Sequence, residues 1–250
     1  MANAKILEKG LRLLEQLAEN AEGMTVGELA DCIGVHKTNA YRYINSLLDM
    51  GYIQTDGDGH YHLGNKILEL GSQKLRRMPL REVAHPFLVQ LSDDTQMTVH
   101  LCVLDRQDVV YIDKIESHRT LPIMSRIGSR APAYCTGVGK ALLSSLPTDQ
   151  VVSLLREFPP TRRTPETITD PIRLLEEIKL TAERGYAIDN GEHEAGIKCF
   201  AAPIRGFGGD VVGAISLTGL KREFDEPKEA ERMISAITKT ATEISRALGA

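Results

Sequence analysis

The 250-residue chain lacks several features that would place it in a common class. It has no run of about 18 apolar residues, which excludes a membrane-spanning helix. Its first residues lack the continuous apolar core of a secretion signal. The four cysteines form no Cys-x-x-Cys pair, and the closest two are 33 positions apart, so no zinc-ribbon spacing is present. These absences predict a cytoplasmic protein whose thiols are reduced.

The chain also lacks a basic excess. It has 34 acidic and 30 basic residues, a net charge of −4, with 42% hydrophobic and 26% charged residues. Those fractions are typical of a soluble globular protein and exclude a disordered chain. The charge balance argues against a nucleic-acid partner, but a sum can hide a local patch. Residues 1–78 have a net charge of −1, whereas residues 65–81 carry five basic side chains and one acidic one. That basic segment fits either a DNA-facing surface or a solvated helix face.

The first sixty residues are organised as three helices. Leu7, Leu11, Leu14 and Leu17, with Ala18, recur at spacings of three and four, which predicts one apolar helix face. After Gly23, a second helix is predicted from the capping box 25–28 and an apolar face that extends to residue 33. A glycine at position 34 is suited to the left-handed turn that ends this helix.

The third helix, predicted over residues 36–48, has two contrasting faces. Ala40 and Ile44 belong to its buried side, with two leucines after them. The opposite side is polar, which is typical of the second helix of a helix-turn-helix, whose N-terminal residues contact base edges in the major groove. Lysine and arginine recognise guanine or phosphate, and asparagine pairs with adenine. The candidate DNA-binding residues are Thr25, His36, Lys37, Thr38, Asn39, Tyr41 and Arg42.

A predicted hairpin follows, with strands at 51–55 and 60–63 around an Asp-Gly-Asp-Gly turn. Three helices and a hairpin are the order of a winged helix, which favours DNA binding over a purely structural subdomain. Asn65 is expected to cap a connecting helix that ends near Pro79. The predicted domains are a winged helix-turn-helix (1–64), a linker helix (65–78) and an effector-binding and oligomerisation domain (79–250).

The second domain mixes strands and helices. Helices are predicted over 80–91, 135–143 and 149–156, from Asp170-Pro171 to Gly185, and after Pro227. Strands are predicted over 97–104, 109–115, 186–189, 197–204 and 211–218, with two hairpins among them. This pattern predicts an α+β fold in which helices pack on an antiparallel sheet.

Over nearly its full length the chain resembles IclR-family transcriptional regulators. The likeness is carried by residues 9–12, 34–38, 41–42 and 61–64, and in the second domain by 128–132, 135–141, 192–199 and 213–217. Residues 111–115, 125–128 and 167–169 resemble the branch that responds to sugar acids such as 2-keto-3-deoxygluconate. The resemblance implies a winged helix on a GAF-like effector domain. Family members usually have Ser-Thr where this chain has Thr38-Asn39, so the operator sequence of other members is not assumed for this chain.

The resemblance also implies a site for a small carboxylate. The implied effector-binding residues are Ala131, Gly137, Val138, Asp189, Ile197, Cys199, Ser216 and Thr218. The first helical residues offer backbone N–H groups to an anion, and Ser216 and Thr218 fall on one face of a strand. An ordinary half-buried sheet explains the serine, threonine and cysteine equally well. His193, between two glutamates, is expected to be a solvated loop residue rather than a metal ligand, so no metal and no cofactor is predicted.

Enzyme motifs fail at particular positions. The phosphate-loop pattern at Gly139-Lys140 has Tyr134 where a glycine is required. Cys135, at a helix start where its pKa could be lowered, is the remaining catalytic candidate, and the chain is predicted not to be an enzyme. Two alternatives stay open: a small-molecule enzyme that dimerises through its winged helix, and an effector-free DNA-binding protein. The expected partners are palindromic double-stranded DNA, a small carboxylate, further copies in a homodimer or homotetramer, and RNA polymerase.

Overall fold

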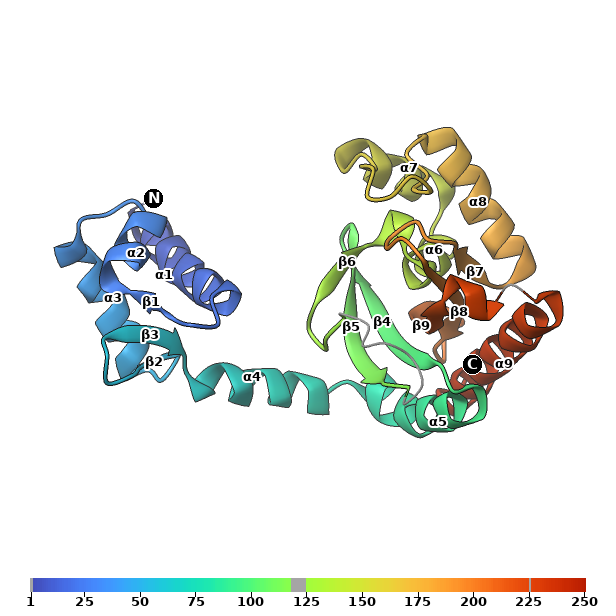
Figure 1. Ribbon diagram of the computed structural model, residues 1–250, viewed down its shortest axis with the longest axis horizontal. Helices are drawn as coiled ribbons and strands as arrows, with labels where there is room; N and C mark the ends of the chain where they lie inside the picture. The colour runs from blue at the N-terminus through green and yellow to red at the C-terminus, as the bar shows by residue number, and fades with distance from the viewer. Residues whose placement is uncertain (1, 118–124, 225) are drawn as a thin grey trace. The chain divides into compact units, whose positions relative to one another are not determined.

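The computed structural model describes residues 2–117, 125–224 and 226–250 (Figure 1). The chain divides into two compact units, Met1–Arg77 and Met78–Ala250, called here the N-terminal and C-terminal units. The connecting helix α4 falls within the first. None of the helices in the described ranges is long and apolar enough to cross a membrane.

The N-terminal unit confirms the predicted winged helix-turn-helix. Its helices are α1 (Ala2–Glu19), α2 (Val26–Cys32), α3 (Lys37–Asp49) and α4 (Asn65–Arg76). Its strands are β1 (Met24–Thr25), β2 (Ile53–Thr55) and β3 (His60–Leu63), in the sheet order β1-β3-β2. Gly34, with a φ of +61°, makes the left-handed turn between α2 and α3. The two-residue strand β1 is too short for its side-chain pattern to predict.

Helix α1 differs from the prediction in which leucines it buries. Leu13 and Leu17 are fully buried in the core with Ile44, whereas Leu7 and Leu11 are more than half exposed. The prediction is therefore correct for Leu17, and for Leu14, which packs against the core while partly exposed, but wrong for the first two leucines. Ala18, placed on the buried face by the same pattern, is also exposed.

The C-terminal unit is built on one six-stranded antiparallel sheet. Its order is β6-β5-β4-β9-β8-β7. The strands are β4 (Thr98–Asp105), β5 (Asp108–Ile115), β6 (Arg130–Pro132), β7 (Ala187–Asp189), β8 (Ile197–Arg205) and β9 (Val211–Leu220). The two predicted hairpins, β4–β5 and β8–β9, both form. Strand β6 was not predicted, because its three residues include Pro132 and show no alternation.

Helices cover both faces of this sheet (Figure 1). They are α5 (Pro79–Thr95), α6 (Gly137–Leu143), α7 (Thr148–Glu157), α8 (Pro171–Arg184) and α9 (Pro227–Ala247), with short 3₁₀ turns at Ala133–Cys135 and Lys221–Phe224. One apolar core joins α5 and α9 to the sheet, and a second joins α6, α7 and α8 to its other face. The predicted α+β architecture is therefore correct.

Three local expectations need correction. The helix expected over 135–143 is a 3₁₀ turn, an extended Thr136 and then α6, because Thr136 acts as the N-cap and its hydroxyl accepts from the Gly139 N–H. Asn65 does not cap α4: it is the first helical residue, and Gly64 holds the cap position without a side-chain bond. Helix α5 continues through Pro86 to Thr95, beyond the predicted residue 91.

Candidate DNA-binding helix and effector cavity

Helix α3 presents the predicted polar residues to solvent. His36 is its N-cap, and Ala40 and Ile44 are fully buried against the rest of the N-terminal unit. Because those two residues fix the rotation of the helix, the opposite face must point outward. The exposed side chains there are His36, Lys37, Thr38, Asn39, Tyr41 and Arg42. Six of the seven predicted DNA-binding residues thus share one accessible helix start.

Thr25, the seventh, is engaged within the protein. Its backbone N–H and its hydroxyl both donate to Glu28 Oε2 at 2.8 Å, and the hydroxyl accepts from the Glu28 N–H at 3.4 Å. This is the predicted capping box, which fixes the start of α2. Since the hydroxyl already has partners, the structure gives Thr25 a role in positioning the helix pair.

In the C-terminal unit, all eight predicted effector residues line one cavity of about 190 Å³. They come from β6, α6, β7, β8 and β9, and only the family resemblance could bring these distant segments together from the sequence. The cavity wall also contains residues that the sequence reasoning missed. These are His100, Tyr111, Ser125, Ser129, Arg130, Thr136, His193 and Glu194.

One end of the cavity is made by the start of α6. Gly137 and Val138 line it, and their backbone N–H groups have no acceptor among the described residues. The helix lies very close to the preceding turn, since a Cβ on Gly139 would be 2.2 Å from the Ala133 carbonyl oxygen. A Cβ on Gly137 would sit 3.3 Å from Ala201 on β8. The two glycines therefore allow α6 to present its first N–H groups close to the sheet.

The other end is polar but uncharged. His100 on β4 lies opposite Ser216 on β9, and its Nδ1 is 3.3 Å from the Ser216 hydroxyl and 3.2 Å from that of Thr218. Its Nε2 is 2.7 Å from the hydroxyl of Ser125. Burial, together with the charge of Lys114, lowers the pKa of His100 to about 3, so the imidazole is neutral. It offers one donor and one acceptor to this group of hydroxyls.

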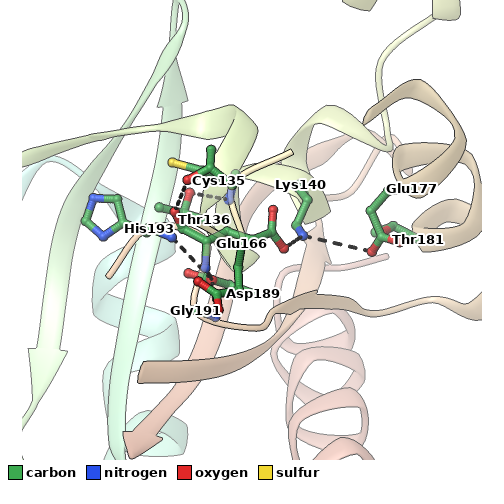
Figure 2. A network of polar contacts seen from close by, with 12 residues as sticks. Cys135, Thr136, Lys140, Glu166, Glu177, Thr181, Asp189, Gly191 and His193 are labelled. Carbon is green, nitrogen blue, oxygen red and sulfur yellow. Dashed lines mark hydrogen bonds and ion pairs between the residues drawn. The ribbon is translucent and has the colours of Figure 1, made fainter. Parts of the chain in front are cut away.

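Asp189 is the cavity's buried carboxylate. Its Oδ1 accepts backbone N–H bonds from Gly191 at 3.1 Å and Glu192 at 2.7 Å, as Figure 2 shows in part. Burial and the neighbouring charge of Glu192 raise its pKa to about 7. A buried carboxylate needs hydrogen-bond partners, and the loop that follows Asp189 supplies them.

Two further expectations are settled by burial. Cys135 is buried, and burial raises the pKa of its thiol to about 12, the opposite of the lowering that a position at a helix start could give. His193, expected to be a solvated loop residue, is half-buried and lines the cavity, while its neighbour Glu192 is 5% exposed and Glu194 is exposed. All four cysteines are free thiols. Within the described ranges, no group of three or more histidine, cysteine or acidic side chains could hold a metal ion.

A winged helix-turn-helix beside an antiparallel-sheet unit with a small cavity defines a helix-turn-helix transcriptional regulator. Residues 6–57 match the IclR helix-turn-helix domain, and residues 72–246 match the family described as bacterial transcriptional regulator IclR C-terminal. The chain belongs to the IclR family. The matched domains and relatives are regulators, not enzymes.

Individual relatives span the same two units. The HTH-type transcriptional regulator XynR of Escherichia coli is 32% identical, over 97% of this chain and 96% of the relative. KdgR of the same organism is 33% identical, over 95% and 90%. The crystal structure of the Thermotoga maritima IclR superimposes on this chain with a TM-score of 0.83 at 35% identity. The superposition covers 100% of this chain and 100% of that one. Nearly equal identities to XynR and KdgR leave the branch within the family open.

Proposed function

We propose that the protein is a ligand-responsive repressor of a catabolic operon, released from a palindromic operator by a small carboxylate of the sugar-acid class. The observation that carries the proposal is the cavity: the eight residues implied by the family resemblance line it together. Family membership supports the DNA-binding half of the proposal.

The chemistry of the cavity favours such a ligand. The N–H groups of Gly137 and Val138 are suited to a carboxylate, while His100, Ser216 and Thr218 are suited to hydroxyl or keto groups. Pockets for drug-sized ligands have volumes of about 300–1,000 Å³, so a cavity of about 190 Å³ is suited to a smaller molecule, such as a small acid.

Dimerisation would supply the two half-sites of a palindrome. The exposed stripe of α1, with Leu7 and Leu11, lines a largely apolar groove of about 680 Å³ that Leu47 and Met50 also border, and Asn39 and Arg42 of α3 contribute polar groups to the same groove. Exposed apolar surface of this kind commonly marks an interface. A second copy of the chain is the proposed occupant, and the dimer can pair further into a tetramer.

The effector signal would reach DNA through α4 and α5. Only residues 77 and 78 separate these helices, and α5 is fastened to β5 at two points. Arg81 Nε donates to the Ile112 carbonyl at 3.0 Å, and His85 Nδ1 lies 2.7 Å from Asp113 Oδ2. Ile112 is the extra residue of a β-bulge, which turns Asp113 toward α5 while Tyr111 lines the cavity. Coupling requires the effector to bind one arrangement of the linker more tightly than another.

The DNA half of the proposal is tested by replacing Arg42 with alanine. Loss of one good base or phosphate contact costs about 1–3 kcal/mol per half-site, so a dimer should lose about 2–6 kcal/mol of operator affinity. Arg12→Ala, which removes the same charge from the exposed side of α1, is the control and should bind normally. Unchanged affinity of the Arg42 variant in a fluorescence-anisotropy titration would remove the recognition-helix assignment.

The effector half is tested by thermal shift with keto and aldonic acids, in the presence and absence of operator DNA. The wild type should be stabilised by one of these acids and release the operator. Asp189→Ala should keep operator binding and lose the response, and Asp210→Ala, an exposed acid in the β8–β9 loop, should keep both. A normal effector response from the Asp189→Ala variant would refute the assignment of this cavity as the effector site.

A further inference from the structure

A buried charge pair lies directly behind the effector cavity. Lys140, on α6 and labelled in Figure 2, is 1% exposed, and its Nζ donates to Oε1 of Glu192, itself 5% exposed. The two residues are 52 positions apart, and neither of them lines the cavity. Burying two charges is costly unless they are paired and hydrogen-bonded. The pair therefore needs an explanation beyond general stability.

Glu192 belongs to the loop between β7 and β8, which forms one wall of the cavity. His193, Glu194 and Ile197, which follow Glu192 in the chain, line that wall. The backbone of the loop is held from two sides: Asp189 Oδ1 accepts the Glu192 N–H at 2.7 Å, and the Thr167 hydroxyl donates to the Glu192 carbonyl at 2.7 Å. The loop is thus tied along its backbone at the residue whose side chain Lys140 holds.

Among the side chains, Lys140 supplies the only bond to the Glu192 carboxylate in the described part of the chain. The second carboxylate oxygen, Oε2, is buried and has no hydrogen-bond partner there. Lys140 has a second acid within reach, because Glu177 Oε1 on α8 lies 3.9 Å from its Nζ, and Arg184 binds that same oxygen at 2.6 Å. Loss of Lys140 would therefore leave Glu192 as an uncompensated buried anion, while loss of Glu192 would leave Lys140 near another carboxylate.

We propose that Lys140 is a positioning residue for effector binding: through Glu192 it holds the loop of residues 190–196 in the place that completes the cavity. An unpaired Glu192 carboxylate would draw this loop toward water, and His193 and Glu194 would leave the cavity wall with it. The proposal rests on the proposed effector function of the cavity. It adds a residue that touches no ligand and acts through another side chain.

The test compares Lys140→Met, Glu192→Gln and the double variant in the full-length protein, with Lys179→Met, an exposed lysine on α8, as the matched control. Effector affinity is measured by calorimetry with the acid that stabilises the wild type in the thermal-shift screen. Lys140→Met should lose about tenfold or more, which corresponds to about 1.4 kcal/mol. Operator affinity without effector and the control's effector affinity should stay at wild-type values.

The double variant tests whether Lys140 acts through its charge or only by filling space. A neutral glutamine needs no counter-charge, so adding Glu192→Gln to Lys140→Met should recover most of the lost affinity, a non-additive result. Equal losses in the single and double variants would overturn the proposal, as would wild-type affinity in Lys140→Met. Should Lys140→Met fail to fold, Lys140→Gln takes its place, with the same expected loss of effector affinity and faster hydrogen exchange at residues 190–194, and wild-type values of both would overturn the proposal.

Hydrogen exchange also keeps this proposal distinct from the effector function itself. If no acid stabilises the wild-type protein, the proposed function fails, yet the loop can still be compared between variants. Faster exchange at residues 190–194 in Lys140→Met, reversed in the double variant, would uphold the positioning of the loop. Unchanged exchange in both would refute it.

Discussion

Replacing Gly139 by alanine should destabilise the C-terminal unit, although alanine is the better helix former. The new Cβ would lie 2.2 Å from the Ala133 carbonyl oxygen and 2.4 Å from the Ala133 Cα. Both are backbone atoms, so no side-chain rotation can relieve the contact, and the helix must move. Overpacking costs up to about 3 kcal/mol, against a gain of about 1 kcal/mol from helix propensity. The net loss is about 2 kcal/mol, or a fall in Tm of about 4–8 °C for a unit of this size.

Thermal unfolding followed by circular dichroism measures this change, and Gly71→Ala provides the control. Gly71 lies inside α4, and a Cβ added there would have no atom within 4 Å, so alanine should be neutral or stabilising. The shift of α6 in the Gly139 variant should also displace the N–H groups of Gly137 and Val138 and weaken effector binding. A Gly139→Ala protein that melts at or above the wild-type temperature would refute the close approach of α6 to the preceding turn.

Three other outcomes follow from contacts in the two units. Because the pKa of Asp189 is raised from 3.8 to about 7, its folded form holds a proton that the unfolded chain releases, so stability should fall as pH rises from about 4 to about 7. Asp189→Asn should flatten this part of the profile of Tm against pH, and parallel profiles would contradict the assignment. Asp113→Asn removes the charged partner of His85 and Arg81 and should cost about 1.5–3 kcal/mol, while effector still binds but releases operator DNA less completely. Leu11→Glu should convert the proposed dimer to a monomer, measured as mass by light scattering, and a dimer mass unchanged from the wild type would show that α1 is not the interface.

Where the sequence carried its own signals, it predicted the structure closely. Helix α8 begins at Pro171 with the Asp170 side chain accepting from the Ile172 N–H, and ends at Gly185 with a φ of +78°. Each of these signals acts within a few residues, so no knowledge of the fold is needed to read it. The capping box at Thr25 was equally local.

The residues that were missed depend on contacts between distant segments. His100 lies in a run of five buried strand residues, so alternation cannot tell which face of the sheet it occupies. The bulge beside Leu101 reverses the faces along the hairpin, and no local signal marks it. Lys140 was assessed only as part of a failed phosphate loop, because its partner Glu192 lies on another element. The effector residues themselves were located through family resemblance, which carries long-range information that periodicity lacks.

The structure also changes how the charge of the chain bears on DNA binding. Of the five basic residues in 65–81, Lys66 pairs with Glu69 at 2.9 Å and Arg81 pairs with Asp113 at 3.5 Å, so neither is a free cation. Lys37 and Arg42, on α3, have no ion-pair partner in the described residues. Each phosphate neutralised adds a small, salt-dependent increment of affinity, and one N-terminal unit can neutralise few. When two N-terminal units are joined in the proposed dimer, binding of one unit to its half-site raises the effective concentration of the other unit at the second half-site. Under the proposed function, a winged helix with so few unpaired cations would depend on dimer geometry for its affinity, and a ligand that alters the spacing of the two N-terminal units would control binding.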